Sequence, residues 1–311
     1  MTKPSGEDDR PRPNADAVMG ERRQLFNIAY RLLGSLADAE DAVQEAYARW
    51  YVMPGHQQEA IASPGAWLTT VTSRICLDLL GSARARREQY VGEWLPEPVP
   101  ERGTTPDPAD RVTLDESVSM AFLIVLESMT PAERVTFTLH DVFRYSFAEV
   151  AEIVGRTPAA CRQLAASARR RIRSSQPFHV TPTAQQATTV SEFKQAWAAK
   201  DIERLIGLLD ADAVAVADSG GIVKAALDPI EGAERIARYY VDLAARAPET
   251  VSFVERVVNG QPGLVLVHDG VIAAVFAFDV VGDRIKRIWA VRNPDKLGRW
   301  KEPPCTSYTS S

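Results

Sequence analysis

The pattern of apolar and polar positions divides the chain into three segments, because helical periodicity is lost in two stretches. The first stretch, residues 88–110, contains five prolines, too many for a helix interior because proline lacks the amide hydrogen of the helical ladder. The second stretch, residues 175–188, is a Ser/Thr/Gln/Pro mixture that is typical of a linker. The sequence therefore predicts an N-terminal tail at 1–17, modules at 18–87, 111–174 and 189–300, and a C-terminal tail at 301–311.

In the first module, apolar residues at helical spacing predict three helices. The first ends at Gly34, and Ser35 with Asp38 then forms an acidic capping-box signal for the second. The second helix has an apolar stripe that continues to Trp50. Its opposite face is acidic and carries Glu40, Asp41, Gln44 and Glu45. An acidic helix face is usually only solvated, and the alternative is that it docks on a partner.

The third helix of this module is predicted to begin at Ser63 and Pro64. Its apolar side consists of Trp67, Leu68, Val71, Ile75 and Leu79. Its other side presents Thr70, Ser73, Arg74 and Asp78, and the chain then becomes basic at Arg84, Arg86 and Arg87. This arrangement predicts a polar, partly cationic outer surface.

The second module contains a helix-turn-helix pattern. Ser146 and Glu149 form a capping box before an apolar stripe, and Gly155 supplies a tight turn. Thr157 then caps a further helix that begins at Pro158. Between residues 157 and 175 there are five arginines and no acid.

This second helix of the pattern places polar and basic side chains on its outer face. They are Arg162, Gln163, Ser167, Arg169, Arg170 and Arg173. Such a set is suited to a helix whose early residues reach base edges while its later arginines neutralise phosphates. The alternatives are a basic helix that is merely solvated, or one that lies on a membrane surface.

The third module combines helices with β-rich segments. Helices are predicted at about 191–209 and 232–245. Four strands follow at 251–258, 263–267, 271–280 and 284–291, with turns at Asn259-Gly260, Asp269-Gly270 and Gly282-Asp283. This order predicts an antiparallel meander wrapped on helices, and such a curved sheet often encloses a pocket.

Composition and charge narrow the picture only slightly. Apolar residues make up 45% and charged residues 25% of the 311 residues, which are ordinary values for a globular protein. The net charge of −5 is weak evidence against a nucleic-acid partner, although the local distribution of arginine matters more. No apolar run approaches the roughly 20 residues that span a bilayer, so a cytoplasmic protein without membrane contact is expected. Cys76, Cys161 and Cys305 lie far apart, which predicts neither a disulfide framework nor a metal site, and no cofactor is expected.

Several longer motifs resemble a known family. They are AYRLLGSLADAEDAVQEAYARW at 29–50, WLTTVTSRICLDLL at 67–80, YVGEWLPEP at 90–98, PAERVTFTLHDVF at 131–143, AACRQL at 159–164 and NPDKL at 293–297. With them the chain resembles extracytoplasmic-function (ECF) RNA polymerase sigma factors, in particular the SigJ-like group. That group carries a C-terminal SnoaL-like domain of the NTF2 fold. The resemblance implies a multidomain fold: two all-α modules, sigma-2 and the sigma-4 helix-turn-helix, followed by a cone-like α+β domain.

The resemblance also implies roles for named residues. The acidic helix would dock on the clamp helices of the largest polymerase subunit. The flap of the second-largest subunit is a further expected contact of the protein. Its expected polymerase-binding residues are Asp38, Asp41, Gln44, Glu45 and Trp50. Promoter DNA would be melted at the minus-10 element by Trp67, Thr70, Ser73, Arg74, Asp78, Arg84, Arg86 and Arg87. The minus-35 element would be read by Thr157, Ala159, Arg162, Gln163, Ser167, Arg169, Arg170 and Arg173.

The same resemblance implies that the third module regulates the other two in cis. Candidate contacts lie in the linker, at Trp94, Leu95, Pro96, Glu97 and Pro98, and in the third module, at Asp218, Gly220, Gly221, Asn293, Pro294, Asp295, Lys296 and Leu297. This chain departs from the group's pattern at Ile222, where the group usually has a lysine after three glycines. It also has Ala166 and Ser167 where the group has larger polar residues.

Other functions remain open for the third module and for the whole chain. The third module could be an enzyme with a pocket acid or base, for which the candidates are Asp212, Asp218, His268 and Asp269. It could also bind a small molecule without chemistry. A simple helix-turn-helix repressor would explain the second module but not the first. For a sigma factor, we expect a compact free form that partly hides the DNA-reading helices.

Overall fold

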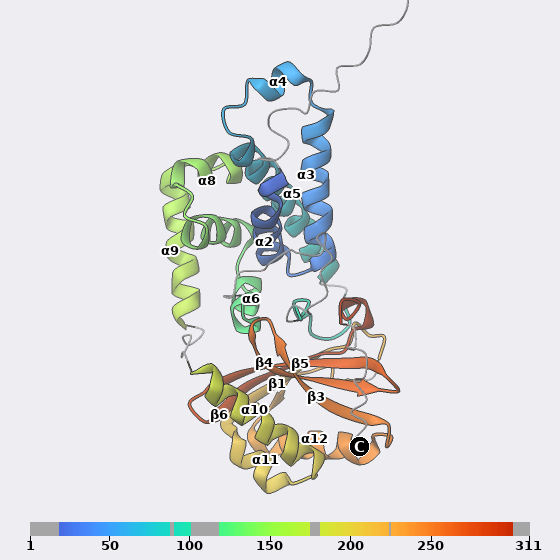
Figure 1. The fold of residues 1–311 in the computed structure, drawn as a ribbon. Coiled ribbons are helices and arrows are strands. Elements are labelled where there is room, and N and C mark those ends of the chain that lie inside the picture. The colour runs from blue at the N-terminus through green and yellow to red at the C-terminus, as the bar shows by residue number, and fades with distance from the viewer. Residues whose placement is uncertain (1–18, 88–89, 101–117, 175–180, 224, 301–311) are drawn as a thin grey trace, which may run out of the picture.

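The computed structural model describes residues 19–87, 90–100, 118–174, 181–223 and 225–300, with only the helical backbone for 83–87. A bundle of helices from the first two modules lies over one face of a β-sheet. Helices of the third module cover the opposite face (Figure 1). The predicted fold class, two helical modules followed by an α+β domain, is therefore confirmed.

The first module forms helices α2 (Arg22–Leu33), α3 (Leu36–Val52), α4 (Gly55–Glu59) and α5 (Pro64–Arg87). The predicted boundary between the first two is confirmed, because Gly34 takes the left-handed conformation with φ of 67° at the end of α2. The Ser35 side chain then accepts a hydrogen bond from the Asp38 amide and caps α3.

The second module contains α6 (Met120–Glu127), α7 (Pro131–Phe137), a π-helical turn η1 (Thr138–Val142), α8 (Phe147–Val154) and α9 (Pro158–Ser174). The capping box of Ser146 and Glu149 is present, and its two hydrogen bonds lower the pKa of Glu149. Gly155 ends α8 with φ of 67°, and Thr157 accepts a hydrogen bond from the Ala160 amide at the start of α9. The helix-turn-helix prediction is confirmed.

The third module begins with α10 (Thr183–Ala198), α11 (Ile202–Leu208), β1 (Leu209–Asp218), β2 (Ile230–Glu231) and α12 (Ala233–Arg246). It continues with β3 (Val251–Val258), β4 (Gln261–His268), β5 (Val271–Val281), β6 (Arg284–Val291) and a short 3-10 helix η2 (Pro294–Lys296). The strand order is β2-β1-β6-β5-β4-β3. All three predicted turns are confirmed, with positive φ at Asn259, Asp269 and Gly282.

Three predictions for this module were wrong in detail. The single helix at 191–209 is two helices, because the chain breaks at Lys200, which has φ of 58°. Helix α10 also starts at Thr183, inside the segment predicted as a linker. Strand β1 was not predicted, since its alanines and aspartates have low strand propensity, and it pairs in parallel with β6. The sheet is therefore mixed rather than a pure antiparallel meander.

Strand β5 is covered on both faces of the sheet, and this explains its nearly continuous apolar sequence. One face packs on α10, α11 and α12 around Phe193, Trp197 and Phe276. The other face forms a separate apolar core with the linker and α6. This junction core contains Leu95, Met120, Val258, Val265, Val267, Val275, Ala277, Trp289, Val291, Leu297 and Trp300. The first two modules share a further core, which includes the buried Cys76 and Cys161.

Candidate functional sites: three helix faces and the linker junction

Helix α3 exposes most of the side chains expected to bind polymerase. Asp38, Asp41, Gln44 and Glu45 are all exposed on its acidic face. Trp50 does not belong with them, because only 3% of its surface is exposed and its ring lies 5.3 Å from that of Trp67. Trp50 is a core residue of the first module and is not part of the exposed acidic face.

Helix α5 presents Thr70, Arg74 and Asp78 outward, with Trp67 half-buried. Ser73 was expected on this surface, but it is 0% exposed because the helix turns it toward the core. The side chains of Arg84, Arg86 and Arg87 lie outside the described residues.

The second module covers part of this α5 face. The Arg74 guanidinium donates to the carbonyl oxygen of Glu152 in α8 at 2.8 Å. The Tyr145 hydroxyl, which precedes α8, lies 3.0 Å from the Thr69 hydroxyl and accepts a hydrogen bond from Gln24. A residue expected to contact the minus-10 element is thus engaged within the protein.

Helix α9 lies at the periphery of the helical half (Figure 1), and most of its arginines are exposed. Six of the eight residues expected to read the minus-35 element are exposed. They are Thr157, Ala159, Arg162, Gln163, Arg170 and Arg173. The Arg162 guanidinium lies 5.5 Å from the centre of the Phe147 ring, a contact that orients it. Ser167 is half-buried instead, and Arg169 pairs with Asp141 at 2.7 Å, so Arg169 attaches α9 to its own module.

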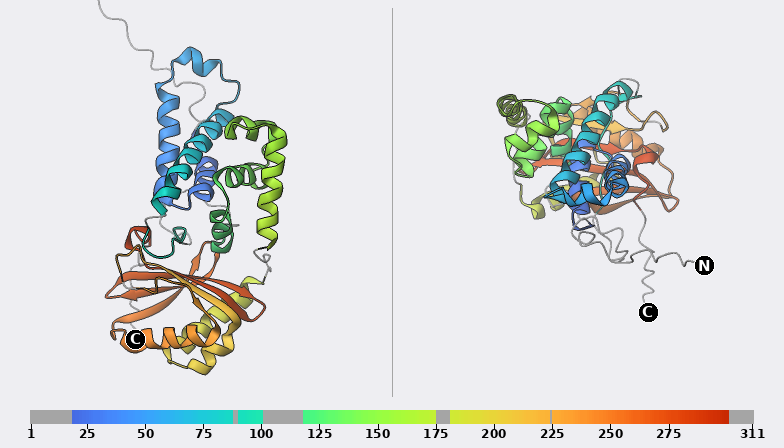
Figure 2. Two further views of the ribbon diagram at one scale, coloured as in Figure 1. Left: turned by 180° about the vertical axis from the view of Figure 1, so that it is seen from behind. Right: turned by 90° about the horizontal axis from the view of Figure 1, so that it is seen from above.

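The linker at residues 90–100 runs between the helical half and the sheet (Figure 2). Its centre is the Asp218 cluster, which we define as Asp218, Tyr90, Asn293, Lys296 and the backbone of Leu95. Asp218 ends β1 and is 0% exposed. One carboxylate oxygen accepts from the Tyr90 hydroxyl at 2.6 Å and from the Gly220 amide. The other accepts from the Leu95 amide at 2.9 Å and from the Lys296 ammonium at 2.6 Å.

Lys296 supplies the positive charge that pairs with Asp218. Its ammonium also donates to the Leu95 carbonyl at 2.6 Å and lies 4.1 Å from the centre of the Trp94 ring. Asn293 donates to the Tyr90 hydroxyl at 2.8 Å, and burial together with the bond to Asp218 raises the pKa of that hydroxyl. The expected linker and NPDKL segments therefore meet in the structure.

Two glycines are required by this geometry. Gly220 has φ of 62°, and a Cβ there would lie 2.6 Å from the Asn293 amide nitrogen. A Cβ on Gly34 would lie 2.7 Å from the Trp94 ring. Gly221 is also in the left-handed region. Asn293 caps η2, because its side chain accepts a hydrogen bond from the Asp295 amide. Pro294 and Asp295 are exposed.

The other edge of the linker contacts the first module. The Glu97 amide donates to the Gly34 carbonyl at 2.8 Å, and its carboxylate accepts from the Leu36 amide at 2.8 Å. The Tyr30 hydroxyl donates to the Glu97 carbonyl at 2.7 Å and accepts from the Asn259 side chain at 3.1 Å. Pro96 and Pro98 are buried, and the Pro98 carbonyl accepts from the Trp300 indole at 3.0 Å.

Sequence reasoning missed four residues of this junction: Tyr30, Tyr90, Asn259 and Trp300. Asn259 signalled only a turn, although its backbone and side chain form a reciprocal pair of hydrogen bonds with Val99 at 2.9 and 3.1 Å. Tyr90 is the first residue of the YVGEWLPEP motif and Trp300 follows the NPDKL motif, so aromatic residues in or next to those motifs were the available signal.

The residues proposed for catalysis do not converge. Asp218 faces the junction, whereas Ala215 and Ala217 of the same strand line a cavity of about 230 Å³ on the other side of the sheet. His268 lines this cavity, but Asp212 and Asp269 are exposed and do not. Among the described residues, no carboxylate lines the cavity. The same ranges contain no group of three or more His, Cys, Asp or Glu residues that could hold a metal ion. None of the described helices is long and apolar enough to cross a membrane.

Family comparisons define the class of protein. Residues 17–86 match the model of sigma-70 region 2, and residues 119–172 match that of sigma-70 region 4. The matched segments contain α2–α5 and α6–α9, the two helical modules. The chain is thus an RNA polymerase sigma factor, as predicted.

Full-length relatives define the family more closely. The chain is 38% identical over 287 residues to the ECF RNA polymerase sigma factor SigJ of Mycobacterium tuberculosis H37Rv, covering 89% of this chain and 90% of SigJ. It is 34% identical to the probable ECF sigma factor SigI of the same strain, with 92% and 95% covered. The SigJ crystal structure superposes with a TM-score of 0.72 at 35% identity, over 91% of this chain and 97% of that one. This chain belongs to the ECF sigma factor family.

Proposed function

We propose that the third module regulates this sigma factor in cis by holding the linker and α6 on one face of its sheet. The observation that carries the proposal is the junction core, where Leu95 of the linker and Met120 of α6 pack on the same strands. As long as both stay docked, the two helical modules remain side by side. The Asp218 cluster then fixes the linker with a buried ion pair and directed hydrogen bonds.

Promoter geometry requires that the helical modules separate. The minus-10 and minus-35 elements are named for positions 25 base pairs apart, which corresponds to about 85 Å at 3.4 Å per base pair. In the compact form, Tyr145 of the second module touches Thr69 of the first at 3.0 Å. The docked form is therefore the inactive one, and the third module acts by binding the docked arrangement better than the separated one.

In the separated form, we assign the exposed face of α5 to the minus-10 element and that of α9 to the minus-35 element. The assignment is supported by Arg74 and Thr70 on α5 and by Arg162, Gln163 and Arg170 on α9, which are all chemically suited to DNA. The exposed acids of α3 are assigned to the clamp helices of the polymerase, which also sets the site of action in the cytoplasm.

One contact within the chain lies at the edge of the face that we assign to polymerase. The Arg299 guanidinium lies 2.7 Å from the Glu40 carboxylate on α3, so the C-terminal segment reaches the edge of the acidic face. This exposed ion pair contributes little energy by itself, but it sits where the polymerase would dock. Docking of the linker and docking of the polymerase are therefore expected to compete.

The test is reconstitution with core RNA polymerase and measurement of promoter-directed transcription. Asp218→Asn should raise transcription at limiting sigma factor, because it weakens the docked form, whereas Asp210→Asn, in a second Asp–Lys pair on β1, should leave it unchanged. A chain that fails to bind core polymerase would refute the assigned function. Equal transcription by the wild type and the Asp218 variant would refute regulation by the junction while leaving sigma activity intact.

A further inference from the structure

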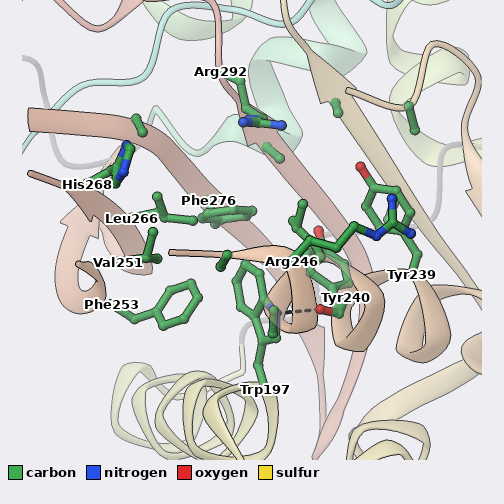
Figure 3. Close-up of a pocket in the computed structure, with 18 of the residues that line it drawn as sticks. Trp197, Tyr239, Tyr240, Arg246, Val251, Phe253, Leu266, His268, Phe276 and Arg292 are labelled. Atoms are coloured by element: carbon green, nitrogen blue, oxygen red, sulfur yellow. Dashed lines mark hydrogen bonds between the residues drawn. The ribbon is translucent and has the colours of Figure 1, made fainter. Parts of the chain in front are cut away.

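A cavity of about 230 Å³ lies between α12 and the sheet face that packs on the helices of the third module (Figure 3). Its walls are largely aromatic, and they include the rings of Trp197, Tyr240, Phe253 and Phe276. The Trp197 indole N–H donates to the Tyr240 carbonyl at 2.8 Å, so this polar atom already has a partner. The cavity therefore offers apolar ring surfaces to a molecule that enters it.

The hydroxyl of Tyr240 is a polar group of this wall that has no hydrogen-bond partner. Only 3% of the Tyr240 surface is exposed, and its hydroxyl bonds to no described residue. By contrast, the buried Tyr30 hydroxyl makes two hydrogen bonds, to the Glu97 carbonyl and the Asn259 side chain. A buried hydroxyl without a partner costs free energy, so a ligand that supplies an acceptor would be stabilised.

The surroundings of the Tyr240 hydroxyl place it on the cavity side of its ring. Tyr239 and Arg292, which both line the cavity, act through their charges on the pKa of Tyr240. Although the residue is buried, its hydroxyl oxygen keeps a little accessible surface. Burial raises the pKa of this hydroxyl, so it stays protonated at neutral pH and can donate a hydrogen bond.

We propose that this cavity binds a small, flat, uncharged molecule that carries one oxygen acceptor, such as an aromatic ketone. The rings of the ligand lie among the aromatic side chains, and its oxygen accepts a hydrogen bond from the Tyr240 hydroxyl. An uncharged ligand is favoured, because a charge among these rings would lose its hydration and no described lining residue is a carboxylate. The volume is below the 300–1,000 Å³ common for drug-sized ligands, so one or two fused rings are expected.

Two strand ends connect this cavity to the junction. Ala217 lines the cavity and is followed by Asp218; Arg292 lines it and is followed by Asn293. The backbone amides of Arg292 and Asn293 both donate to the Asp218 carbonyl, at 2.7 and 3.0 Å. A ligand in the cavity is thus one residue away from the Asp218 cluster, and we expect it to change linker docking. This coupling rests on the proposed function, whereas binding itself does not.

Equilibrium dialysis of the full chain tests the site with two probes of nearly equal shape. 1-Indanone carries a carbonyl oxygen, and indane lacks it. Tyr240→Phe should weaken the binding of 1-indanone about three- to tenfold, the worth of one hydrogen bond, and should leave indane binding at least as tight. Tyr51→Phe, at an exposed tyrosine of α3, is the matched control and should bind both probes as the wild type does.

Retained indane binding also shows that the cavity of the Tyr240 variant is folded. An unchanged affinity of Tyr240→Phe for 1-indanone, an equal loss of affinity for both probes, or no binding of 1-indanone by the wild type at about 1 mM would each overturn the proposal.

Chemical denaturation checks separately that the Tyr240 hydroxyl has no partner within the protein. Tyr240→Phe should keep the denaturation midpoint of the wild type, because it removes no hydrogen bond. Tyr30→Phe should lower the midpoint, because it removes two. A midpoint lowered equally by the two substitutions would show that the Tyr240 hydroxyl is already paired, and it would overturn the proposal.

The coupling has its own readout, because linkage is reciprocal. Asp218→Asn should change the affinity for 1-indanone, and Asp210→Asn, which alters the other Asp–Lys pair on β1, should not. An unchanged affinity in the Asp218 variant would overturn the coupling and leave the binding site standing. None of these measurements requires polymerase, so their outcomes are independent of the transcription assay.

Discussion

Helices α5 and α9 are both candidate DNA-binding helices, but in the compact chain they differ in how far the second module covers their outer faces. On α5, Arg74 is bonded to the Glu152 carbonyl and the neighbouring Thr69 meets Tyr145. On α9, Arg162, Gln163 and Arg170 face outward. If the proposed assignments hold, the closed form covers part of the helix assigned to the minus-10 element and leaves the helix assigned to the minus-35 element exposed.

The contact between α5 and the second module contributes little free energy, because it relies on a few partly exposed hydrogen bonds. The strong interactions lie at the linker junction, far from either DNA-reading face. There a fully buried carboxylate binds an ammonium, a hydroxyl and a backbone amide. Under the proposed regulation, the junction controls access to α5 indirectly, because it keeps the second module in place.

The largest effect is expected for Asp218→Asn. The amide cannot balance the Lys296 charge, and its NH₂ group must face a donor, so docking of the linker should lose about 3–5 kcal/mol. Hydrogen exchange at the Leu95, Glu97 and Val99 amides measures this loss. Asp210→Asn removes the more exposed pair with Lys286 and should change stability by less than about 1 kcal/mol. Similar exchange in the two variants would contradict the assignment of the junction as the lock.

The next largest effect concerns α9. Arg162→Ala should relax base preference in the minus-35 element by about 1–3 kcal/mol, whereas Arg170→Ala should weaken binding to every sequence and reduce the salt slope by about one. Fluorescence anisotropy with promoter and scrambled duplexes separates the two cases. Because α9 is open in the compact form, both effects should keep their size in the Asp218→Asn background. Effects that emerge only in that background would show that α9 is also covered.

A smaller effect is expected at the cover of α5. Tyr145→Phe removes the hydroxyl that joins Gln24 to Thr69, and it should weaken the contact between the helical modules by about 1 kcal/mol. Chemical denaturation reports the change, and Tyr51→Phe, at an exposed tyrosine, is the control. A loss as large as that of Asp218→Asn would place the lock at α5 instead.

The smallest effect is a pH dependence at Glu97. Burial raises the pKa of the Glu97 carboxyl above its ordinary value. The hydrogen bond from the Leu36 amide and the charges of Arg299 and Lys296 lower the pKa, but their effect is smaller. The docked linker thus holds this proton more tightly than the released linker, so docking weakens as pH rises through the raised pKa. Hydrogen exchange between about pH 4 and pH 7 should reveal this trend in the wild type and a flatter profile in Glu97→Gln. Identical profiles would exclude Glu97 as its source.

Local signals were sufficient to predict most elements and their ends. Gly34, Gly155 and the capping box of Ser146 and Glu149 act within one helical turn, so their effects are readable in sequence. Strand β1 was missed because its pairing partner β6 lies about 75 residues away, and that pairing, not the strand's own composition, makes it a strand.

The candidate sites were predictable only in part, for the same reason. The motifs indicated that the linker and the NPDKL segment matter, but not that a buried Asp218 joins them or that Tyr30 and Asn259 complete the contact. Ser73 was misplaced on an outer face, whereas periodicity placed Trp50 correctly in the apolar stripe and only the family resemblance assigned it to polymerase binding. Long-range packing decided each of these cases.

The distance between the helical modules tests the central claim most directly. Spin labels at Gln57→Cys on α4 and Ser174→Cys on α9, with Cys305 replaced by serine, report this distance in the free chain by pulsed electron resonance. We predict one narrow distance distribution in the wild type and in Asp210→Asn, and a broad distribution extending to longer distances in Asp218→Asn. A narrow, unchanged distance in the Asp218 variant would contradict the account.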